Sequence, residues 1–399
     1  MPVVDVGVTC ALGTTWPAVT DALRAGRSGL VFHEIHGYPT AVGPAEPNAP
    51  ATWDGGLVLD RGVALALNCV GQLRTLPELD PRRCAVFWGV GIAGAHWLES
   101  SYELYCAERG EAKTSPWTVP MIMPNAAASL IAKKLDLRGG AWTHASACSS
   151  AAMAIGQALQ AIRSGSLDLA VVGGSDSMLT PGMLHAWARM RVLARTTREG
   201  ACAACRPFDS ARNGLCLAEG ASCLVLMNPA LAKAMQLATL AEIHGFGHSC
   251  DAYDLTAPNA MGQAQAMDLA LRDARMDMGE LSYICAHATG TRRGDLTELE
   301  AIEIASGGHI PSCPVSSIKS AIGHTMAASG AMATALTIAM MRHDWVAPTL
   351  HLSHADAQVE HWNLPTGGGI PHARLDTAMV NAFGFGGSNA SIVLKKSPG

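Results

Sequence analysis

The sequence predicts an α/β protein whose β-sheets are buried between helices. Segments typical of strands alternate with segments typical of helices along the whole chain, which is the pattern of sheets covered by helices. The 399 residues are 49% hydrophobic and 15% charged, so a large core can form. The 41 glycines indicate many tight turns and close approaches of the backbone.

In the first half of the chain, short apolar runs that end at glycines predict buried strands. These strands are expected within residues 1–13 and at 84–88 and 169–172. Apolar residues at helical spacing predict helices at 96–109, 126–135 and 149–164. A proline-marked loop separates the first two helices, with Pro116, Pro120 and Pro124.

The second half repeats this alternation. Strands are expected at residues 222–227 and 282–286, with a helix at 264–275 between them and an Ala-rich helix after His324. Residues 378–396 predict two strands around the glycine-rich turn 384–387. A strand ends at Asn228 and Pro229 with no low-complexity linker behind it, so we expect a soft boundary between halves 1–230 and 231–399.

The charges and cysteines argue against several classes of protein. The net charge is −5 and no Lys/Arg block is present, which disfavours nucleic-acid binding. The start lacks the charged segment of a signal peptide, so the 12 cysteines are expected to be reduced thiols in the cytoplasm. Residues 325–341 are uncharged, but they are mainly Ala, Ser, Gly, Thr and Met and follow Lys319 and His324. A buried core helix is favoured there over a membrane span.

Residues 89–94 satisfy the G-x-G-x-x-G pattern, after an expected strand and before an expected helix. A dinucleotide site also needs an acidic residue about 20 positions further on, at the end of a second strand. The region near position 112 is instead polar and rich in proline. A tight turn that allows close helix packing is therefore favoured over a nucleotide site.

Two other patterns could bind a metal. Cys202 and Cys205 form a C-x-x-C pair, but the later gap between Cys216 and Cys223 resembles no common zinc-ligand spacing. Incidental thiols are therefore favoured. Two histidine pairs lie in expected loops, where surface histidines are the simpler interpretation: His33 with His36, and His351 with His354.

Three segments place reactive side chains at turns. Cys148 stands just before a helical segment, where the helix N-terminus should lower the thiol pKa and favour the nucleophilic thiolate. His287 ends a strand beside two threonine hydroxyls, which suits hydrogen bonding to a substrate. His324 begins the Ala-rich helix, with Lys319 five residues earlier. Taken singly, each of these side chains could also be a packed structural residue. The glycine-rich turn 381–389 could bind an oxyanion or be a plain hairpin turn.

Together these segments resemble the β-ketoacyl synthases of the thiolase-like superfamily over nearly the whole chain. The motifs that carry the resemblance stand in the family's order: Ala147-Cys-Ser-Ser150, Arg206-Pro-Phe-Asp209 with Glu219-Gly-Ala221, His287-x-Thr-x-Thr291, Lys319-x-x-x-Gly-His324 and Asn381-x-Phe-Gly-Phe-Gly-Gly-x-Asn389. The resemblance implies a thiolase-like α/β fold with two related halves, each with a mixed β-sheet, layered α-β-α-β-α. The nucleophile would lie in the first half and both histidines in the second.

One cysteine with two histidines is similar to the elongating synthases. Such an enzyme joins an acyl chain on Cys148 to malonyl-acyl carrier protein by decarboxylative Claisen condensation, with His287 and His324 stabilising the enolate. A coenzyme A thiolase would have a second cysteine in the late turn, where this chain has residues 381–383, and an initiating synthase would have Asn in place of His324. A non-catalytic chain-length factor would lack the nucleophile. Both the thiolase and the chain-length factor are kept as alternatives.

The resemblance also assigns supporting roles. The backbone N–H groups of Cys148 and Phe385 would form the oxyanion hole, and Lys319 would orient the histidine region. No metal, flavin or nicotinamide cofactor is implied. The further positions are Glu298 as the charge partner of Lys319, Asp295 as a second supporting acid, Thr289 and Thr291 on the phosphopantetheine arm, Ile92 in the acyl pocket, and Phe383 as a substrate-binding residue.

The implied partners are an acyl carrier protein and a second synthase-like subunit, which could be another copy of the chain or a chain-length factor. Because carrier proteins of this kind are acidic, a local basic patch is expected. The candidates for it are Lys133, Lys134, Arg206 and Arg61.

Departures from the family pattern predict a specialised branch. Ala288 stands where the family has glycine, and Ala333 stands where many relatives have glutamate. Neither change removes a reacting group. Together with the short N-terminus, they favour polyketide or aryl-polyene synthesis over housekeeping fatty-acid synthesis.

Overall fold

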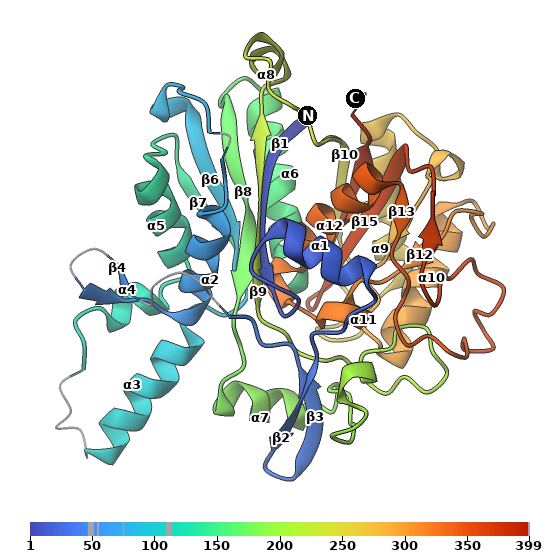
Figure 1. The fold of residues 1–399 in the computed structure, drawn as a ribbon, viewed down its shortest axis with the longest axis horizontal. Coiled ribbons are helices and arrows are strands. Elements are labelled where there is room, and N and C mark those ends of the chain that lie inside the picture. Colours follow the sequence, from blue (N-terminus) through green and yellow to red (C-terminus); the bar gives the residue numbers. More distant parts are fainter. Residues whose placement is uncertain (47–51, 54–55, 75, 109–113, 398–399) are drawn as a thin grey trace.

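A computed structural model describes residues 1–46, 52–53, 56–74, 76–108 and 114–397. Its centre is a mixed sheet of ten strands, and helices pack on both faces of this sheet (Figure 1). The end of the helix expected at 96–109 and the region near position 112 lie outside the described residues.

The ten strands form two sets of five with the same order and directions. The first set is β7 (Ala141–His144), β6 (Cys84–Gly89), β8 (Leu169–Asp176), β9 (Gly220–Met227) and β1 (Pro2–Cys10). The second set is β12 (Val315–Ser316), β11 (Ile284–Cys285), β15 (Thr377–Gly384), β16 (Ser388–Lys395) and β10 (Ala241–Cys250). In each set the first three strands are parallel, and the last two pair antiparallel.

A short antiparallel ladder joins the two sets at their inner edges. Pro2 of β1 pairs with Glu242 of β10, and Val3 pairs with Ala241. The predicted fold of two related halves, each with a mixed sheet, is therefore confirmed. Beyond the prediction, the hydrogen bonds between β1 and β10 connect the two sheets into one.

Helices from both halves cover the sheet. They are α1 (Trp16–Arg24), α2 (Arg61–Val70), α5 (Ala126–Leu135), α6 (Ser150–Arg163), α9 (Ala260–Ala274), α10 (Arg292–Ala305) and α12 (Ser329–His343). All residues of α12 from Ser329 to Met341 are buried, which explains why the uncharged stretch 325–341 looks like a membrane span in sequence. Within the described part of the chain, no helix is both long and apolar enough to cross a membrane.

Smaller elements lie at the periphery. They are the hairpin β2 (Val31–Ile35) and β3 (Tyr38–Val42), the strand pairs β4 (Thr52–Trp53) with β5 (Leu57–Val58) and β13 (Trp345–Val346) with β14 (Ile370–Pro371), and the helices α3 (Ala95–Ala107), α4 (Thr118–Ile122), α7 (Pro181–Arg189), α8 (Pro229–Ala234) and α11 (Lys319–Ile322). The helix α3 projects from the lower left of the molecule in Figure 1 and buries only Ala95.

The two central helices begin in the same way. A 3-10 turn, η3 (Ala147–Ser149), runs directly into α6, and a second 3-10 turn, η6 (Met326–Ala328), runs directly into α12. Each turn starts with a left-handed residue, Ala147 at φ 51° and Met326 at φ 49°. Gly330 lets the helices approach closely, because a Cβ there would lie 2.8 Å from the Cβ and nitrogen of Ala152. The starts of α6 and α12 therefore meet at the centre of the molecule.

The structure also adjusts two predicted elements. The strand predicted at 169–172 continues through Gly173 and Gly174 to Asp176 in β8, because the sheet is packed so tightly there that only glycine fits against Trp88 and Ala151. The strand predicted at 282–286 keeps only two residues in β11, since its carboxyl end turns into the segment that carries His287.

Candidate active site

The structure brings the three predicted reacting side chains together. Cys148 follows β7 in the turn η3, His287 follows β11, and His324 precedes the turn η6. The Cys148 sulfur lies 3.1 Å from His324 Nε2, and one ligand atom from each of the three residues lies within 4.8 Å of the others. The two imidazole rings meet edge to face, with centroids 5.2 Å apart. A single thioester group can therefore reach all three side chains.

Hydrogen bonds to Nδ1 fix the tautomer of His324. The Met326 backbone N–H donates to Nδ1 at 3.3 Å, and the Ser329 hydroxyl oxygen lies 2.8 Å from the same nitrogen. Because a backbone N–H can only donate, we assign the ring proton to Nε2. Burial, helped by the charge of Lys319, lowers the pKa of His324 well below its usual value, so the ring is neutral. It presents an N–H donor to the side of Cys148.

A buried carboxylate holds the turn that carries His287. Glu298 accepts hydrogen bonds from the backbone N–H of His287 at 2.8 Å and of Ala288 at 2.7 Å. The side-chain amide of Asn381 donates to the same carboxylate at 3.1 Å. Burial is the main cause that lowers the pKa of His287 well below its usual value. The site therefore contains two neutral imidazoles.

The expectation that the helix N-terminus lowers the pKa of Cys148 is wrong for the free site. Burial raises this pKa to about 12, although the charge of Lys319 and the backbone N–H groups of Phe385 and Cys148 lower it. Loss of water around the sulfur outweighs the nearby charge and dipoles. Cys148 is therefore a neutral thiol before a substrate enters.

Lys319 is a buried cation that acts on all three reacting groups. Its charge lowers the pKa values of Cys148, His287 and His324. Burial lowers the pKa of Lys319 itself, while the charges of Cys285, Glu298 and Cys148 raise it. The predicted pairing with Glu298 is thus electrostatic and at longer range than a direct ion pair. Glu298 bonds the backbone of the histidine turn instead.

Two backbone N–H groups face the Cys148 sulfur, and they belong to Cys148 itself and to Phe385. Gly384 brings the glycine-rich turn close to the nucleophile, because a Cβ there would lie 3.2 Å from the Cys148 nitrogen. Phe385 stacks on Trp187 with ring centroids 6.0 Å apart. Two fixed donors beside the sulfur suit the oxyanion that forms when this sulfur attacks a carbonyl group.

The three reacting side chains line a cavity of about 330 Å³. Thr289, Thr291 and Phe383 line it too, and the two threonine hydroxyl oxygens are 3.1 Å apart. Ile92, which the resemblance places in the acyl pocket, does not line this cavity. Its side chain is 41% exposed and borders a separate small cavity beside Asp176. The backbone N–H of Ile92 bonds the Asp176 carboxylate, which holds this segment at the end of β8.

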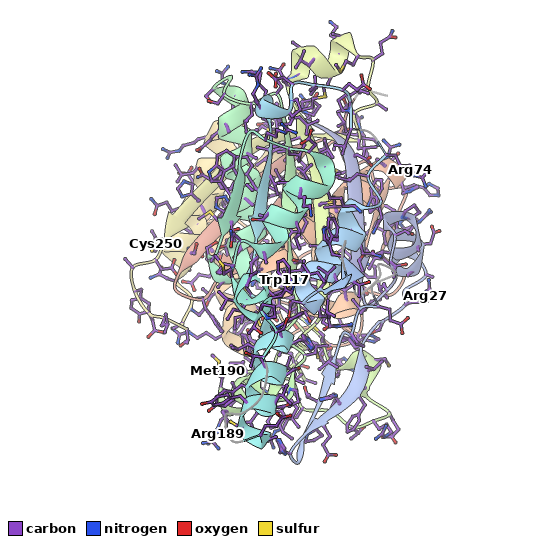
Figure 2. The ribbon with its side chains drawn as sticks, turned by 90° about the vertical axis from the view of Figure 1, so that its left-hand side faces the viewer. Arg27, Arg74, Trp117, Arg189, Met190 and Cys250 are labelled. Carbon is purple, nitrogen blue, oxygen red and sulfur yellow. The ribbon has the colours of Figure 1, made fainter. Side chains whose placement is uncertain are left out.

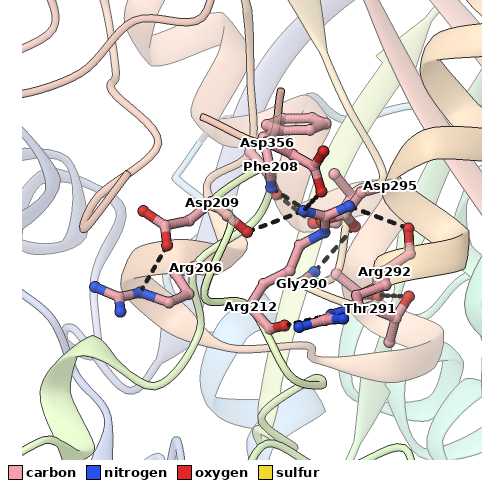
Figure 3. Close-up of polar contacts among 12 residues, drawn as sticks. Arg206, Phe208, Asp209, Arg212, Gly290, Thr291, Arg292, Asp295 and Asp356 are labelled. Carbon is pink, nitrogen blue, oxygen red and sulfur yellow. Dashed lines mark hydrogen bonds and ion pairs between the residues drawn. The ribbon is translucent and has the colours of Figure 1, made fainter. Parts of the chain in front are cut away.

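A buried ionic network supports the turn after His287 (Figure 3). Arg212 is 1% exposed and contacts the carboxylates of Asp295 at 3.3 Å and Asp356 at 3.0 Å. Asp295 also accepts a hydrogen bond from the backbone N–H of Gly290 at 3.1 Å. Asp295 therefore anchors the backbone between the two cavity-lining threonines, and Arg212 compensates its buried charge.

The four candidate basic residues are all engaged within the protein. Arg61 pairs with the buried Glu219 at 2.5 Å, Lys133 and Lys134 lie over the ring of Trp53 at 5.7 and 5.8 Å, and Arg206 donates to the backbone carbonyl of His351 at 3.2 Å. Arg61 in particular serves an internal ion pair rather than a free basic surface. Arg293, which the sequence argument did not name, is exposed and lines the catalytic cavity.

The remaining sequence patterns lie apart from this cavity. Gly94 ends the G-x-G-x-x-G segment in a left-handed conformation, φ 63°, as the N-cap of α3. Cys202 is exposed while Cys205 is buried, and the ring of His36 lies 5.7 Å from that of His185. Within the described ranges, the group of three side chains with metal-ligand spacing is the reacting set itself.

Three polar residues of the site were not predicted from the sequence. Ser329 contacts His324, and its position five residues later at a helix start was a usable signal. Asp176 is 2% exposed and accepts from the Ala327 backbone N–H at 3.1 Å; burial raises its pKa to about 7. Gln263 lines the catalytic cavity from α9. The sequence gives no signal for Asp176 or Gln263, because separate elements bring them to the site.

Comparisons with known proteins agree with this geometry. The N-terminal domain of β-ketoacyl synthases matches residues 62–232, and the C-terminal domain matches residues 240–353. Nodulation protein E of Rhizobium sp. (strain N33) is 33% identical over 99% of this chain and 98% of that protein. The 3-oxoacyl-[acyl-carrier-protein] synthase 2 of Coxiella burnetii is 32% identical over the same shares.

Solved structures give the same result. The ishigamide ketosynthase/chain length factor has a TM-score of 0.91 and 28% identity, over 100% of this chain and 99% of that chain. A β-ketoacyl synthase from Burkholderia phymatum STM815 has a TM-score of 0.88 and 29% identity over the same shares. With both domains matched and relatives above 30% identity along the whole length, the chain belongs to the β-ketoacyl synthase family of acyltransferases.

Proposed function

We propose that Cys148 takes an acyl chain from a carrier protein and that the two histidines then drive decarboxylative condensation with malonyl-acyl carrier protein. In the first stage the Cys148 sulfur bonds to the acyl carbonyl carbon as the bond from that carbon to the carrier sulfur breaks. The N–H groups of Cys148 and Phe385 hold the oxyanion between these events. The thiol proton leaves with the carrier thiol, so no separate base is consumed.

In the second stage the malonyl thioester loses CO2, and its electron pair becomes an enolate. His287 and His324 donate N–H hydrogen bonds to the enolate oxygen. The enolate carbon bonds to the acyl carbonyl carbon, the bond from that carbon to Cys148 breaks, and the thiolate takes a proton from water. Neutral imidazoles suit this step, because they stabilise the charge without protonating the carbon.

The observation that carries the proposal is the convergence of a thiol, two neutral imidazoles and two backbone donors at one cavity. Thr289 and Thr291 line this cavity and would contact the phosphopantetheine arm. No cofactor is needed, because the malonyl carboxylate supplies the electron pair for the new bond. A coenzyme A thiolase is disfavoured, since residues 381–383 offer no second cysteine.

The same proposal includes partners and pathway. Solved relatives include a ketosynthase with its chain length factor at 28% identity. All 12 cysteines are free thiols that form no disulfide, which suits a reducing cytoplasm. With Ala288 and Ala333 at positions where the family pattern differs, we place the chain in a polyketide or aryl-polyene branch.

A second subunit would cover the side of β7 and α3. The strand β7 is an edge of the sheet, and an unpaired edge is a template for another strand. Large apolar side chains are exposed on neighbouring elements, including Trp117 at 49%, Val119 at 62% and Trp142 at 43%. Trp117 lies near the middle of this side in Figure 2. An apolar patch beside a free edge is expected at a dimer interface.

Intact-mass analysis tests the proposal. The chain is mixed with a panel of acyl-carrier thioesters, beside Cys148→Ala, and malonyl-carrier is then added. We expect an acyl adduct confined to Cys148 that is discharged as a ketoacyl-carrier product two carbons longer. If no acyl group forms an adduct, with or without a candidate partner subunit, the catalytic proposal fails and a chain-length factor is the better description.

A further inference from the structure

The wall of the catalytic cavity contains a buried carboxamide whose oxygen has no partner. Gln263 lies on α9 and is 3% exposed, and no residue in the described ranges donates to its Oε1. The same side chain lines the cavity that holds Cys148. Nearly all buried acceptors are hydrogen-bonded, because an unpaired one destabilises the fold. An unpaired acceptor in the wall of a cavity therefore indicates that a bound ligand donates to it.

The surroundings of Gln263 show that α9 does not need a polar side chain there. Its neighbours Gly262, Ala264 and Ala266 are small and buried, and they pack against the sheet. Gln265, two positions later, is exposed on the other face of the helix, as glutamine usually is. The buried Oε1 of the first glutamine therefore costs stability that no hydrogen bond within the described ranges offsets.

The chemistry of the carboxamide identifies the ligand group. A glutamine side chain offers one acceptor oxygen and two N–H donors on the same plane, and its complement is another amide. If the proposed function is right, the substrates reach Cys148 on a phosphopantetheine arm, which contains two secondary amides. The acyl and malonyl groups themselves carry no N–H. The threonine hydroxyls of Thr289 and Thr291, on the same cavity, can serve the carbonyl groups of the arm.

We infer that Gln263 recognises an amide of the phosphopantetheine arm by accepting its N–H at Oε1. This inference rests on the proposed function and adds a specificity-determining residue to it. Gln263 would thus select carrier-bound thioesters over thioesters that lack an amide.

The test measures ligand binding without requiring acyl transfer. The probes are S-methyl N-acetylcysteamine, which keeps one amide near the sulfur, and methyl pentyl sulfide, which has none. Each is titrated for its protection of Cys148 against iodoacetamide, and the adduct on Cys148 is quantified by peptide mass mapping. In Gln263→Leu we expect half-protection by the amide probe to need about threefold to tenfold more ligand. Gln265→Leu, the matched control on the exposed face, should need the same concentration as the unaltered chain.

The comparison has three results that would overturn the inference. The first is an unchanged ligand concentration for half-protection in Gln263→Leu. The second is an equal loss of protection by both probes, which would indicate a reshaped cavity. The third is a lower denaturation midpoint of this variant, which would indicate a structural role. We expect the midpoint in urea to rise instead, because the substitution removes an unpaired buried acceptor. Failure of acyl transfer would contradict the proposed function separately, since the protection assay does not require acyl transfer.

Discussion

At the scale of single residues, the reactivity of Cys148 depends on groups around a thiol that burial has made weakly acidic. Burial raises its pKa to about 12, and Lys319 is the main charge that opposes this rise. Burial keeps both histidines neutral by lowering their pKa values, and the charge of the same cation adds to this effect. Lys319 therefore makes the thiol more acidic and the imidazoles less basic, which suits a site that first needs a nucleophile and then needs donors.

Removing this charge should make Cys148 less reactive. In Lys319→Met the thiol pKa is expected to rise further, so less thiolate is present at any pH below it. Each unit of this rise slows alkylation roughly tenfold. Alkylation by iodoacetamide from pH 7 to pH 10, with the adducts assigned to individual cysteines by peptide mass mapping, measures the effect. The exposed Cys202 is an internal control whose rate should not change. Equal Cys148 rates in both proteins would contradict the assigned role.

Asp176 should make stability depend on pH. Burial raises its folded pKa to about 7, whereas an unfolded aspartate has its ordinary low value. Between these values the folded state binds a proton that the unfolded state releases, so stability is lost as pH rises from about 4 to about 7. The substitution Asp176→Asn removes this loss. The free energy of unfolding of the variant, relative to that of the unaltered chain, should therefore increase by about 4 kcal/mol as pH rises over this range. Urea denaturation at three pH values measures the difference. Parallel stability curves would contradict the assignment.

At the scale of elements, the site is assembled from turns that follow buried strands and precede central helices. The turn after β11 carries His287, and its backbone N–H groups donate hydrogen bonds to the carboxylates of Glu298 and Asp295. Arg212 connects this turn to the loop that contains Asp356, and the Arg212 side chain is only 1% exposed. Buried carboxylates therefore hold the backbone of this turn.

The substitution Arg212→Met should destabilise the fold by about 3–5 kcal/mol, because it leaves the buried Asp295 carboxylate without a counter-charge. Guanidinium denaturation measures this loss. Arg82→Met, at the exposed pair with Asp80, is the matched control and should leave the free energy of unfolding nearly unchanged. A similar midpoint for both variants would show that the buried network is not structural.

At the scale of the whole molecule, two halves with the same strand order share one site. The first half supplies Cys148 and the second supplies both histidines and Lys319. The exposed side of β7 and α3 is a separate feature, with apolar side chains that the described chain leaves uncovered. A complete molecule is expected to have a second subunit on that side.

Trp117→Arg should separate the subunits, because a charge at the centre of an apolar interface must be desolvated without a partner. Size-exclusion chromatography with light scattering should give twice the chain mass for the unaltered protein and the single mass for this variant. Met235→Arg, at a residue that is 39% exposed near α8, is the control and should remain a dimer. A dimeric Trp117→Arg would place the interface elsewhere.

Much of this molecule could be predicted from the sequence, and the failures share a cause. The helix predicted at 126–135 is α5 with the same bounds, because its apolar spacing is local information. The three side chains that meet in the candidate site could also be singled out, since each lies in a short turn motif. The direction of the Cys148 pKa shift could not, because it depends on how completely the folded chain excludes water. Gln263 was missed, since its neighbours come from distant segments.

The matching starts of α6 and α12 have a consequence for the ancestry of the site. Counting from the left-handed residues Ala147 and Met326, the counterpart of Cys148 is Ala327 and the counterpart of His324 is Ala145. A duplicated ancestor with both reactive residues in each copy would have held two sites that overlap at the axis between the helices. In this chain alanine stands at both counterpart positions, so the internal symmetry of the backbone coexists with one cysteine and one histidine at the axis between the helices.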